Sequence, residues 1–193
     1  HYQWPTIGYM RDLENTDMQT IRAFYKSYYA PNNAVIVVVG DIDISATLEL
    51  IWKAYGEIPA QNIDTYHPKN EEPQEEPRKS VLAKPISTTQ VLVAYPAPAQ
   101  NSPDYAALEL LNNTLCDGES SYLYRRMVIE ERLASDVSGF LTPFAEPGLF
   151  EFSLTPMPGV HHDKIIEQLS VELKSACQLL STEDVDKARN SLE

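Results

Sequence analysis

Residues 24–41 read FYKSYYAPNNAVIVVVGD, in which an aromatic helix face, a Pro-Asn-Asn stop and an apolar run follow one another. Apolar residues repeat at helical spacing up to Tyr29, which predicts a helix over 16–29. Proline and asparagine then end that helix. The valine-rich run 34–39 shows no polar alternation, so we predict a strand buried on both faces. A second amphipathic helix is predicted over 45–55.

The segment after this second helix has a different composition. Prolines stand at positions 59, 68, 73, 77 and 85, and residues 71–76 read EEPQEE. Such a stretch buries too little apolar surface to fold by itself, and proline keeps it extended. We therefore predict a linker over 61–85, which separates a first part, residues 1–60, from a second part, residues 86–193.

The second part contains strand and helix patterns in blocks. In residues 149–155, Phe150, Phe152 and Leu154 alternate with polar residues, which is typical of a strand with one buried face. A Pro-Gly turn precedes this strand, so we predict that it pairs antiparallel with the strand before the turn. The predicted elements are a strand at 89–95, a helix from 103 to a break at 117, a helix at 120–131, strands at 137–142 and 149–155, a helix at 163–180 and a last helix from 182. This order predicts an α+β fold, with an antiparallel sheet covered by helices on one side.

Composition and charge exclude two classes of interaction. The 193 residues are 43% apolar and 22% charged, as in ordinary soluble globular proteins, and the net charge is −13. Nucleic acids need a basic surface, so we expect no nucleic-acid partner. A membrane span takes about 20 consecutive apolar residues, and no run approaches that length. Cys116 and Cys177 lie on apolar helix stripes, which predicts two buried free thiols, with a disulfide as the alternative.

The sequence carries none of the common catalytic motifs. Its four histidines are His1, His67, His161 and His162, so neither H-E-x-x-H nor the inverted H-x-x-E-H occurs. C-x-x-C, G-x-S-x-G and the phosphate-binding G-x-x-x-x-G-K are also absent. These residues alone therefore predict an α+β protein without an active site of its own.

His161-His162-Asp163 is the one local group in the sequence with residues of metal-ligand type. Adjacent side chains in a turn are expected to diverge, whereas metal sites need ligands on a rigid face. We therefore predict no metal site in this chain and a solvated turn in which Asp163 caps the next helix. His161 and His162 are the candidates for a competing interpretation, a small independent metal-binding protein.

Gly118-Glu119-Ser120-Ser121 opens a predicted helix and is a second candidate. Backbone amides at the start of a helix are able to bind an anion. The alternative that we prefer is a tight turn followed by a serine cap.

Several motifs occur in order along nearly the whole chain. Residues 1–13 read HYQWPTIGYMRDL, and 24–41 add a helix, Y-x-P-x-N, a strand and Gly-Asp. The second half contributes Leu108 to Leu111 with Asn112, G-x-S-S-x-L-Y from Gly118, Leu133-Ala134, and Gly148-Leu149-Phe150. Together these motifs resemble zinc metallopeptidases of the pitrilysin/insulinase (M16) family, which are relatives of the mitochondrial processing peptidase.

The resemblance implies a metallohydrolase domain of the processing-peptidase type. In that family an H-x-x-E-H motif in the first domain holds zinc, which activates water. Residues 1–60 then correspond to the end of this catalytic domain, with the motif upstream, and residues 86–193 correspond to most of the non-catalytic second domain. Zinc is therefore expected in a longer parent protein, a zinc endopeptidase. This segment is expected to hold no cofactor and to be inactive alone.

The implied role is to help enclose a peptide or unfolded-protein substrate in a chamber, together with another peptidase domain or subunit. The alternative is a catalytically inactive family member that acts as a structural or assembly subunit. Family members often hold the peptide with an arginine and a tyrosine seven residues apart, where this sequence has Val128 and Ser135. Another domain or subunit is expected to supply that pair. Bacterial cytoplasm and periplasm both fit the sequence.

Overall fold

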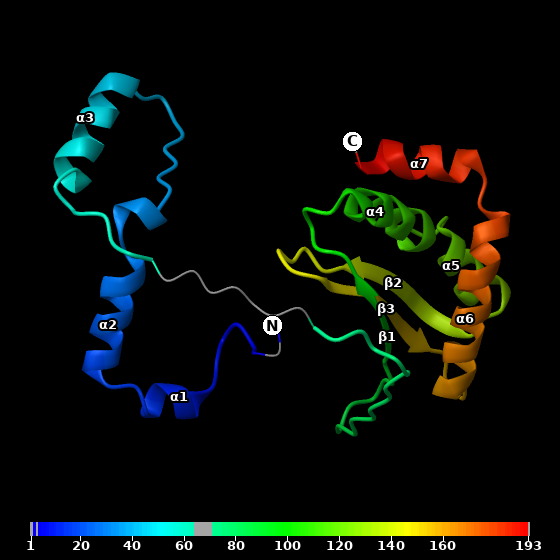
Figure 1. The fold of residues 1–193 in the computed structure, drawn as a ribbon. Coiled ribbons are helices and arrows are strands. Elements are labelled where there is room, and N and C mark those ends of the chain that lie inside the picture. Colours follow the sequence, from blue (N-terminus) through cyan, green and yellow to red (C-terminus); the bar gives the residue numbers. More distant parts are fainter. Residues whose placement is uncertain (1, 3, 64–70, 193) are drawn as a thin grey trace. The chain divides into compact units, whose positions relative to one another are not determined.

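The computed structural model describes residues 2, 4–63 and 71–192 (Figure 1). The chain divides into two compact units, residues 1–78 and 79–193, and each is described by itself. The division falls inside the predicted linker 61–85, of which residues 64–70 lie outside the described residues.

The first unit contains the two helices predicted at 16–29 and 45–55. The first begins where Asp17 accepts a hydrogen bond from the Thr20 amide at 2.7 Å, and the second where Asp43 accepts one from the Ala46 amide at 2.8 Å. These bonds satisfy amides that have no partner within the helix. The elements are α1 (Met10–Glu14), α2 (Met18–Tyr28), η1 (Pro31–Asn33) and α3 (Ile44–Tyr55).

Residues 34–39 do not form the predicted strand. They belong to no sheet, and Val35 and Val39 are 90% and 91% exposed. A buried strand needs neighbouring strands for its hydrogen bonds and other layers over both of its faces. The described residues of the first unit include no strand. The prediction of a buried strand is therefore wrong for this chain.

The second unit is built on a three-stranded antiparallel sheet in the order β1-β3-β2. Phe152, in the central strand, lies opposite Val93 on one side and Gly139 on the other. Phe150, Phe152 and Leu154 are all buried on one face of the sheet, as their alternation predicts. The strands are β1 (Val91–Ala97), β2 (Ala134–Leu141) and β3 (Gly148–Pro156).

Helices cover one face of this sheet (Figure 1), which confirms the predicted α+β architecture. Ser102 caps α4 and Pro103 is its first residue. The predicted helix at 120–131 is only partly α-helical, because residues 125–130 form a wider π-helical segment. The elements are α4 (Pro103–Cys116), α5 (Tyr122–Tyr124), η2 (Arg125–Glu130), α6 (His162–Leu179) and α7 (Thr182–Leu192). No helix in the described part of the chain is long and apolar enough to cross a membrane.

Helix α4 approaches the sheet closely at Gly139. A β-carbon built on Gly139 would lie 2.1 Å from Asn112 Oδ1 and 2.8 Å from Cys116 Sγ. Glycine is therefore required for this approach of helix to strand. The layer between sheet and helices is filled by fully buried side chains, among them Leu123, Met127, Phe152, Leu154, Ile165 and Leu169.

The two cysteines differ in burial. Cys116 is a buried free thiol, as predicted, whereas Cys177 is free and exposed, so the prediction of a second buried thiol is wrong. Ala176, one residue before Cys177, is among the α6 residues that are buried against the core. The next residue lies about 100° further round the helix and therefore faces outward.

Candidate functional site

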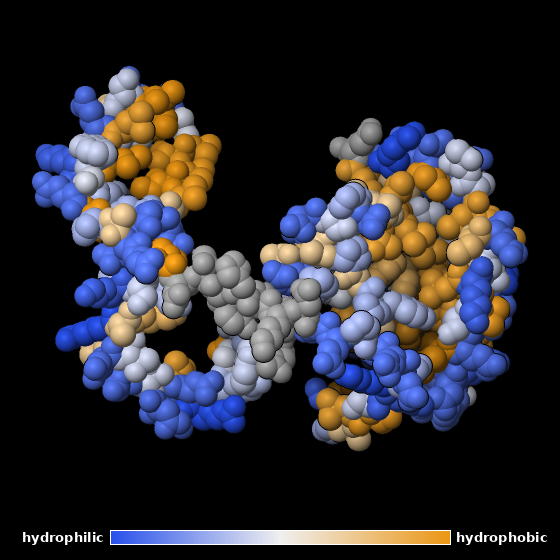
Figure 2. All heavy atoms as spheres, viewed as in Figure 1, coloured by the Kyte–Doolittle hydropathy of each residue, from blue (hydrophilic) through white to orange (hydrophobic). Residues whose placement is uncertain are grey.

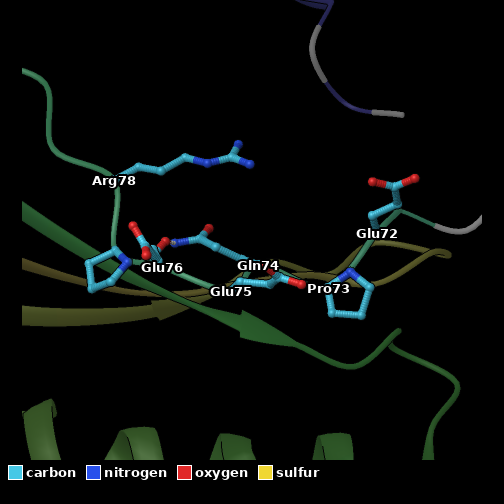
Figure 3. A pocket seen from close by; sticks show the side chains of 7 residues that line it. Glu72, Pro73, Gln74, Glu75, Glu76 and Arg78 are labelled. Carbon is cyan, nitrogen blue, oxygen red and sulfur yellow. Dashed lines mark hydrogen bonds between the residues drawn. The ribbon is translucent and has the colours of Figure 1, made fainter.

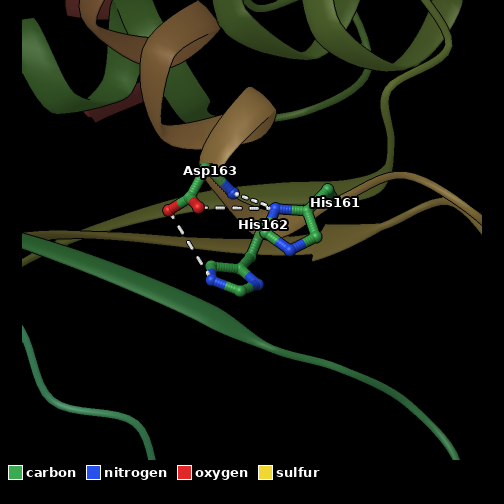
Figure 4. A group of neighbouring side chains, drawn as sticks. All are labelled: His161, His162 and Asp163. Carbon is green, nitrogen blue, oxygen red and sulfur yellow. Dashed lines mark hydrogen bonds and ion pairs between the residues drawn. The ribbon is translucent and has the colours of Figure 1, made fainter.

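The described residues contain one group of three side chains able to ligate a metal, His161, His162 and Asp163 (Figure 4). The two imidazole rings lie side by side, with centroids 4.1 Å apart and planes at 31°. The Asp163 carboxylate lies 3.5 Å from His161 Nδ1 and 3.6 Å from His162 Nε2. The prediction that adjacent histidines diverge is therefore wrong. The backbone is extended at His161 and helical from His162, and this change of direction brings the rings together.

His161, and not Asp163, occupies the N-cap of α6. Its Nδ1 accepts a hydrogen bond from the Asp163 amide at 3.3 Å. The Asp163 carboxylate instead accepts a hydrogen bond from Lys79 Nζ at 2.5 Å. This bond from Lys79 lowers the pKa of Asp163 below its ordinary value. The prediction of an Asp163 cap is therefore wrong, and its side chain joins residue 79 to the start of α6.

This group does not fit the catalytic zinc that the resemblance implies. A hydrolytic zinc site of that kind takes two histidines from one helix, with the glutamate between them as the base that activates water. The sequence contains no such motif, and the three residues here are consecutive. His1 and His67 lie outside the described residues. No hydrolytic step is therefore assigned to this cluster.

The Gly118–Ser121 turn is present, but the predicted serine cap is not. Gly118 has a φ of 76°, and the Ser121 amide donates to its carbonyl at 3.1 Å. Ser121 occupies the N-cap position of α5 without a capping hydrogen bond from its side chain. Its Oγ is buried and has no hydrogen-bond partner among the described residues, while Lys187 donates to Ser120 Oγ. A buried hydroxyl is closed to an anion from solvent, so the turn is not assigned an anion site.

Sequence reasoning missed a buried charged network on α6. Glu172 is 2% exposed and accepts hydrogen bonds from Tyr122 Oη at 2.9 Å and from Gln168 Nε2 at 2.8 Å. Arg126 donates to the same carboxylate through Nε at 3.1 Å and Nη2 at 3.2 Å. Arg126 also pairs with Glu130, four residues on. The Glu172 network, made of these five residues, ties α5 and η2 to α6.

The pKa values of this network exclude a role in proton transfer at neutral pH. Burial raises the pKa of Glu172, but hydrogen bonds from Arg126, Tyr122 and Gln168 outweigh it and hold that pKa below its ordinary value. Burial and the bond to Glu172 raise the pKa of Tyr122 to about 12. Hydrogen bonds to Glu172 and Glu130 raise the pKa of Arg126. A general acid or base works best with a pKa near the working pH, so the network is structural.

The face of the sheet away from the helices carries exposed apolar side chains. Leu92 and Phe140 are 62% and 55% exposed, and Leu149 is also exposed. Phe140 lies opposite Glu151 in the strand register, so both belong to this face. A solvated sheet face is normally polar, so three exposed apolar side chains make this face a candidate interaction surface. We name Leu92, Phe140, Leu149 and Glu151 the open sheet face.

The first unit exposes a second apolar surface. A groove of about 1190 Å³ is lined by aromatic and aliphatic residues of α2, of α3 and of the chain from Tyr29 to Ile36. Figure 2 shows hydrophobic residues gathered over this part of the unit. Phe24 and Tyr28 pack with ring centroids 4.8 Å apart, and Tyr25 stacks on Tyr29 at 4.7 Å. We name this surface the aromatic groove.

A second hollow is lined by residues 72–78 alone (Figure 3). These residues are consecutive and exposed, and Gln74 Nε2 donates to the Glu76 carbonyl at 2.8 Å. A bend of this kind does not hold groups from different elements around one point, as a binding site does. It is therefore not assigned a function.

Comparison with known proteins agrees with the motifs and the fold. Residues 15–192 match the family described as the Peptidase M16 inactive domain. The zinc protease PqqE of Helicobacter pylori is 30% identical over 173 residues, which cover 87% of this chain and 38% of that protein. The crystal structure of a protease from Helicobacter pylori is 26% identical with a TM-score of 0.80, and the match covers 96% of this chain and 46% of that one.

A second solved structure shares the fold. The M16 inactive domain from Pseudomonas fluorescens has a TM-score of 0.77 at 21% identity, and the match covers 97% of this chain and 45% of that one. This chain thus spans less than half the length of these relatives. The family predicted from the ordered motifs is confirmed, and with it the antiparallel sheet and its helical layer. This chain belongs to the M16 peptidase family and matches its inactive domain.

Proposed function

We propose that this chain is a non-catalytic wall of the chamber in which a zinc-dependent M16 endopeptidase encloses its peptide substrate. The observation that carries the proposal is the open sheet face. Leu92, Phe140 and Leu149 stand exposed on a rigid sheet whose other face is covered by helices. Such a surface offers apolar contacts to an unfolded peptide and excludes water from it, which helps hold the peptide in line with a distant metal.

The zinc and its general base belong, in this proposal, to a part of the protein upstream of residue 1. The Helicobacter pylori relative is named a zinc protease, whereas this sequence contains neither H-E-x-x-H nor H-x-x-E-H. We assign residues 1–60 to the end of the catalytic domain, 61–85 to the linker and 86–193 to the inactive domain. The chain by itself then cleaves nothing, and its partners are the catalytic domain and a peptide or unfolded protein.

The exposed surfaces of the first unit support this assignment. The aromatic groove and residues 34–39 leave many large apolar side chains in solvent. A contiguous apolar surface of this kind marks a contact with further protein. We assign this surface to contact with the rest of the catalytic domain, whose strands would pair with residues 34–39.

The proposed contact with substrate is tested in the full-length peptidase with a double variant, in which both Leu92 and Phe140 are replaced by glutamine. We expect KM for an unfolded fluorescent peptide to rise about tenfold, which corresponds to about 1.4 kcal/mol of lost binding. Val171→Gln is the control, because Val171 is also apolar and is 48% exposed but lies on α6 in the helical layer. Identical kinetic constants for the wild type and the Leu92/Phe140 variant would refute the proposal that this sheet face contacts the substrate.

The second candidate is a catalytically inactive family member that acts as a structural or assembly subunit. It is favoured by the lack of the peptide-holding arginine and tyrosine at the two positions where the family resemblance places them. Val128 packs against the core, and Ser135 Oγ donates to the Thr155 carbonyl at 3.3 Å. Metal analysis of the full-length protein separates the two functions. Bound zinc with chelator-sensitive cleavage supports the peptidase, and absence of both supports the subunit.

A further inference from the structure

We propose that His161, His162 and Asp163 form a surface site for a divalent transition-metal ion such as zinc, separate from any catalytic zinc. The proposal rests on the convergence of three donor side chains at the start of α6 (Figure 4). It concerns this chain alone and does not depend on the proposed chamber wall.

The donor separations suit a tetrahedral ion. Zinc binds imidazole nitrogen and carboxylate oxygen at about 2.0–2.2 Å, so two ligands of one tetrahedral ion lie roughly 3.4 Å apart. The Asp163 carboxylate is 3.5 Å from His161 Nδ1 and 3.6 Å from His162 Nε2. One ligand atom from each residue lies within 4.8 Å of the others. A small rotation of the exposed His161 ring and the half-buried His162 ring therefore brings all three donors onto one ion.

The donor types select the class of ion. Two imidazoles with one carboxylate suit zinc, nickel, copper or cobalt, whereas calcium and magnesium prefer oxygen ligands throughout. His161 Nδ1 accepts a long hydrogen bond of 3.3 Å from the Asp163 amide, and a metal–nitrogen bond would replace it. His161 and Asp163 are exposed, so an ion reaches the site directly from solvent.

Lys79 would compete with a bound metal ion for the Asp163 carboxylate. Its ammonium lies 2.5 Å from Asp163 Oδ1 and therefore already neutralises the carboxylate that the metal would use. A dication beside the same carboxylate repels the ammonium, so metal and Lys79 compete for Asp163. Lys79 is the first residue of the second unit. Metal binding would thus release Lys79 from the start of α6.

Zinc titration of this 193-residue chain by calorimetry tests the site, with cobalt absorption as a second readout of coordination geometry. We expect one ion per chain, at least tenfold weaker binding in His161→Ala and in His162→Ala, and severalfold tighter binding in Lys79→Met. Asp186→Asn and Cys177→Ser are the matched controls, because they remove an exposed carboxylate and an exposed thiol elsewhere. Neither control should change the affinity.

Two results would overturn the proposal of a metal site at His161, His162 and Asp163. One is the absence of saturable heat in both the wild type and Lys79→Met. The other is binding that survives in the His161→Ala/His162→Ala double variant, which would place the ion elsewhere on the chain. Circular dichroism of each variant checks that these substitutions leave the fold unchanged.

Discussion

Arg126 holds the carboxylate of Glu172 with two donors, Nε at 3.1 Å and Nη2 at 3.2 Å, and so joins the π-helical segment η2 to α6. The two residues are 46 positions apart in the sequence. Planar two-donor pairing of this kind is among the strongest side-chain interactions, and it fixes orientation as well as distance. The pair therefore sets how the segment leading into β2 lies on the helical layer.

Removal of the Glu172 charge should destabilise the second unit. Glu172→Gln removes the charged acceptor of Arg126, which keeps its pair with Glu130, and we expect a loss of about 2 kcal/mol in the free energy of unfolding. Urea denaturation of the wild type and the variant measures this difference in unfolding free energy. Glu167→Gln is the matched control, because Glu167 is exposed on the same helix, and it should change stability by less than about 0.5 kcal/mol. Equal stabilities of the two variants would show that the buried pair contributes nothing.

The same network predicts a dependence of stability on pH. Because the pKa of folded Glu172 lies below the unfolded value of about 4.3, its contribution is fully present above that pH. It is lost as the pH falls through the folded-state pKa. The difference in unfolding free energy between wild type and Glu172→Gln should therefore be constant from pH 6 to 8 and shrink in acid. A difference that grows in acid would contradict the lowered pKa.

Gly139→Ala should weaken the contact between α4 and the sheet. The added methyl group would meet Asn112 Oδ1 and Cys116 Sγ, so the helix or the strand must shift. Overpacking of this kind costs about 1–3 kcal/mol, which thermal unfolding would detect as a lower Tm. Ser138→Ala, at the exposed neighbouring position in β2, is the control. An unchanged Tm in Gly139→Ala would mean that the two layers are not in close contact.

The two thiols should differ sharply in reactivity. Burial, together with the Asp117 charge, raises the pKa of the Cys116 thiol to about 12, so little thiolate forms at neutral pH. Cys177 is exposed. We expect a thiol reagent to label one cysteine per native chain and two per unfolded chain, with Cys177→Ser abolishing the native reaction. Rapid labelling of both cysteines in the native chain would contradict the burial of Cys116.

The exposed valine run should promote self-association of this chain. Unpaired apolar segments of high β-propensity pair with other chains. Val37→Lys, at a position 78% exposed, should leave unfolding free energy unchanged and reduce association in sedimentation experiments. Leu179→Lys, on α6, is the control for a charge added at another exposed apolar site. Unfolding of the first unit by Val37→Lys would show instead that this residue is buried.

Local sequence pattern was sufficient for much of the fold. The alternation of Phe150, Phe152 and Leu154 and the turn before Gly148 specified the β2–β3 hairpin, because strand faces and tight turns depend on neighbouring residues. Ser102 and Pro103 likewise marked the start of α4. The ordered motifs were specific enough to identify the M16 family, whose inactive-domain match covers residues 15–192.

Tertiary structure decided the features that depend on distant groups. Glu172 is buried because Tyr122 and Arg126, about 50 residues earlier, supply its hydrogen bonds. The pairing of Asp163 with Lys79 joins residues 84 positions apart, and helix periodicity does not reveal it. Residues 34–39 carry the pattern of a buried strand, yet they lie in solvent. Side-chain pattern expresses a preference for burial, but burial itself requires the surfaces and hydrogen-bond partners that other parts of a fold provide.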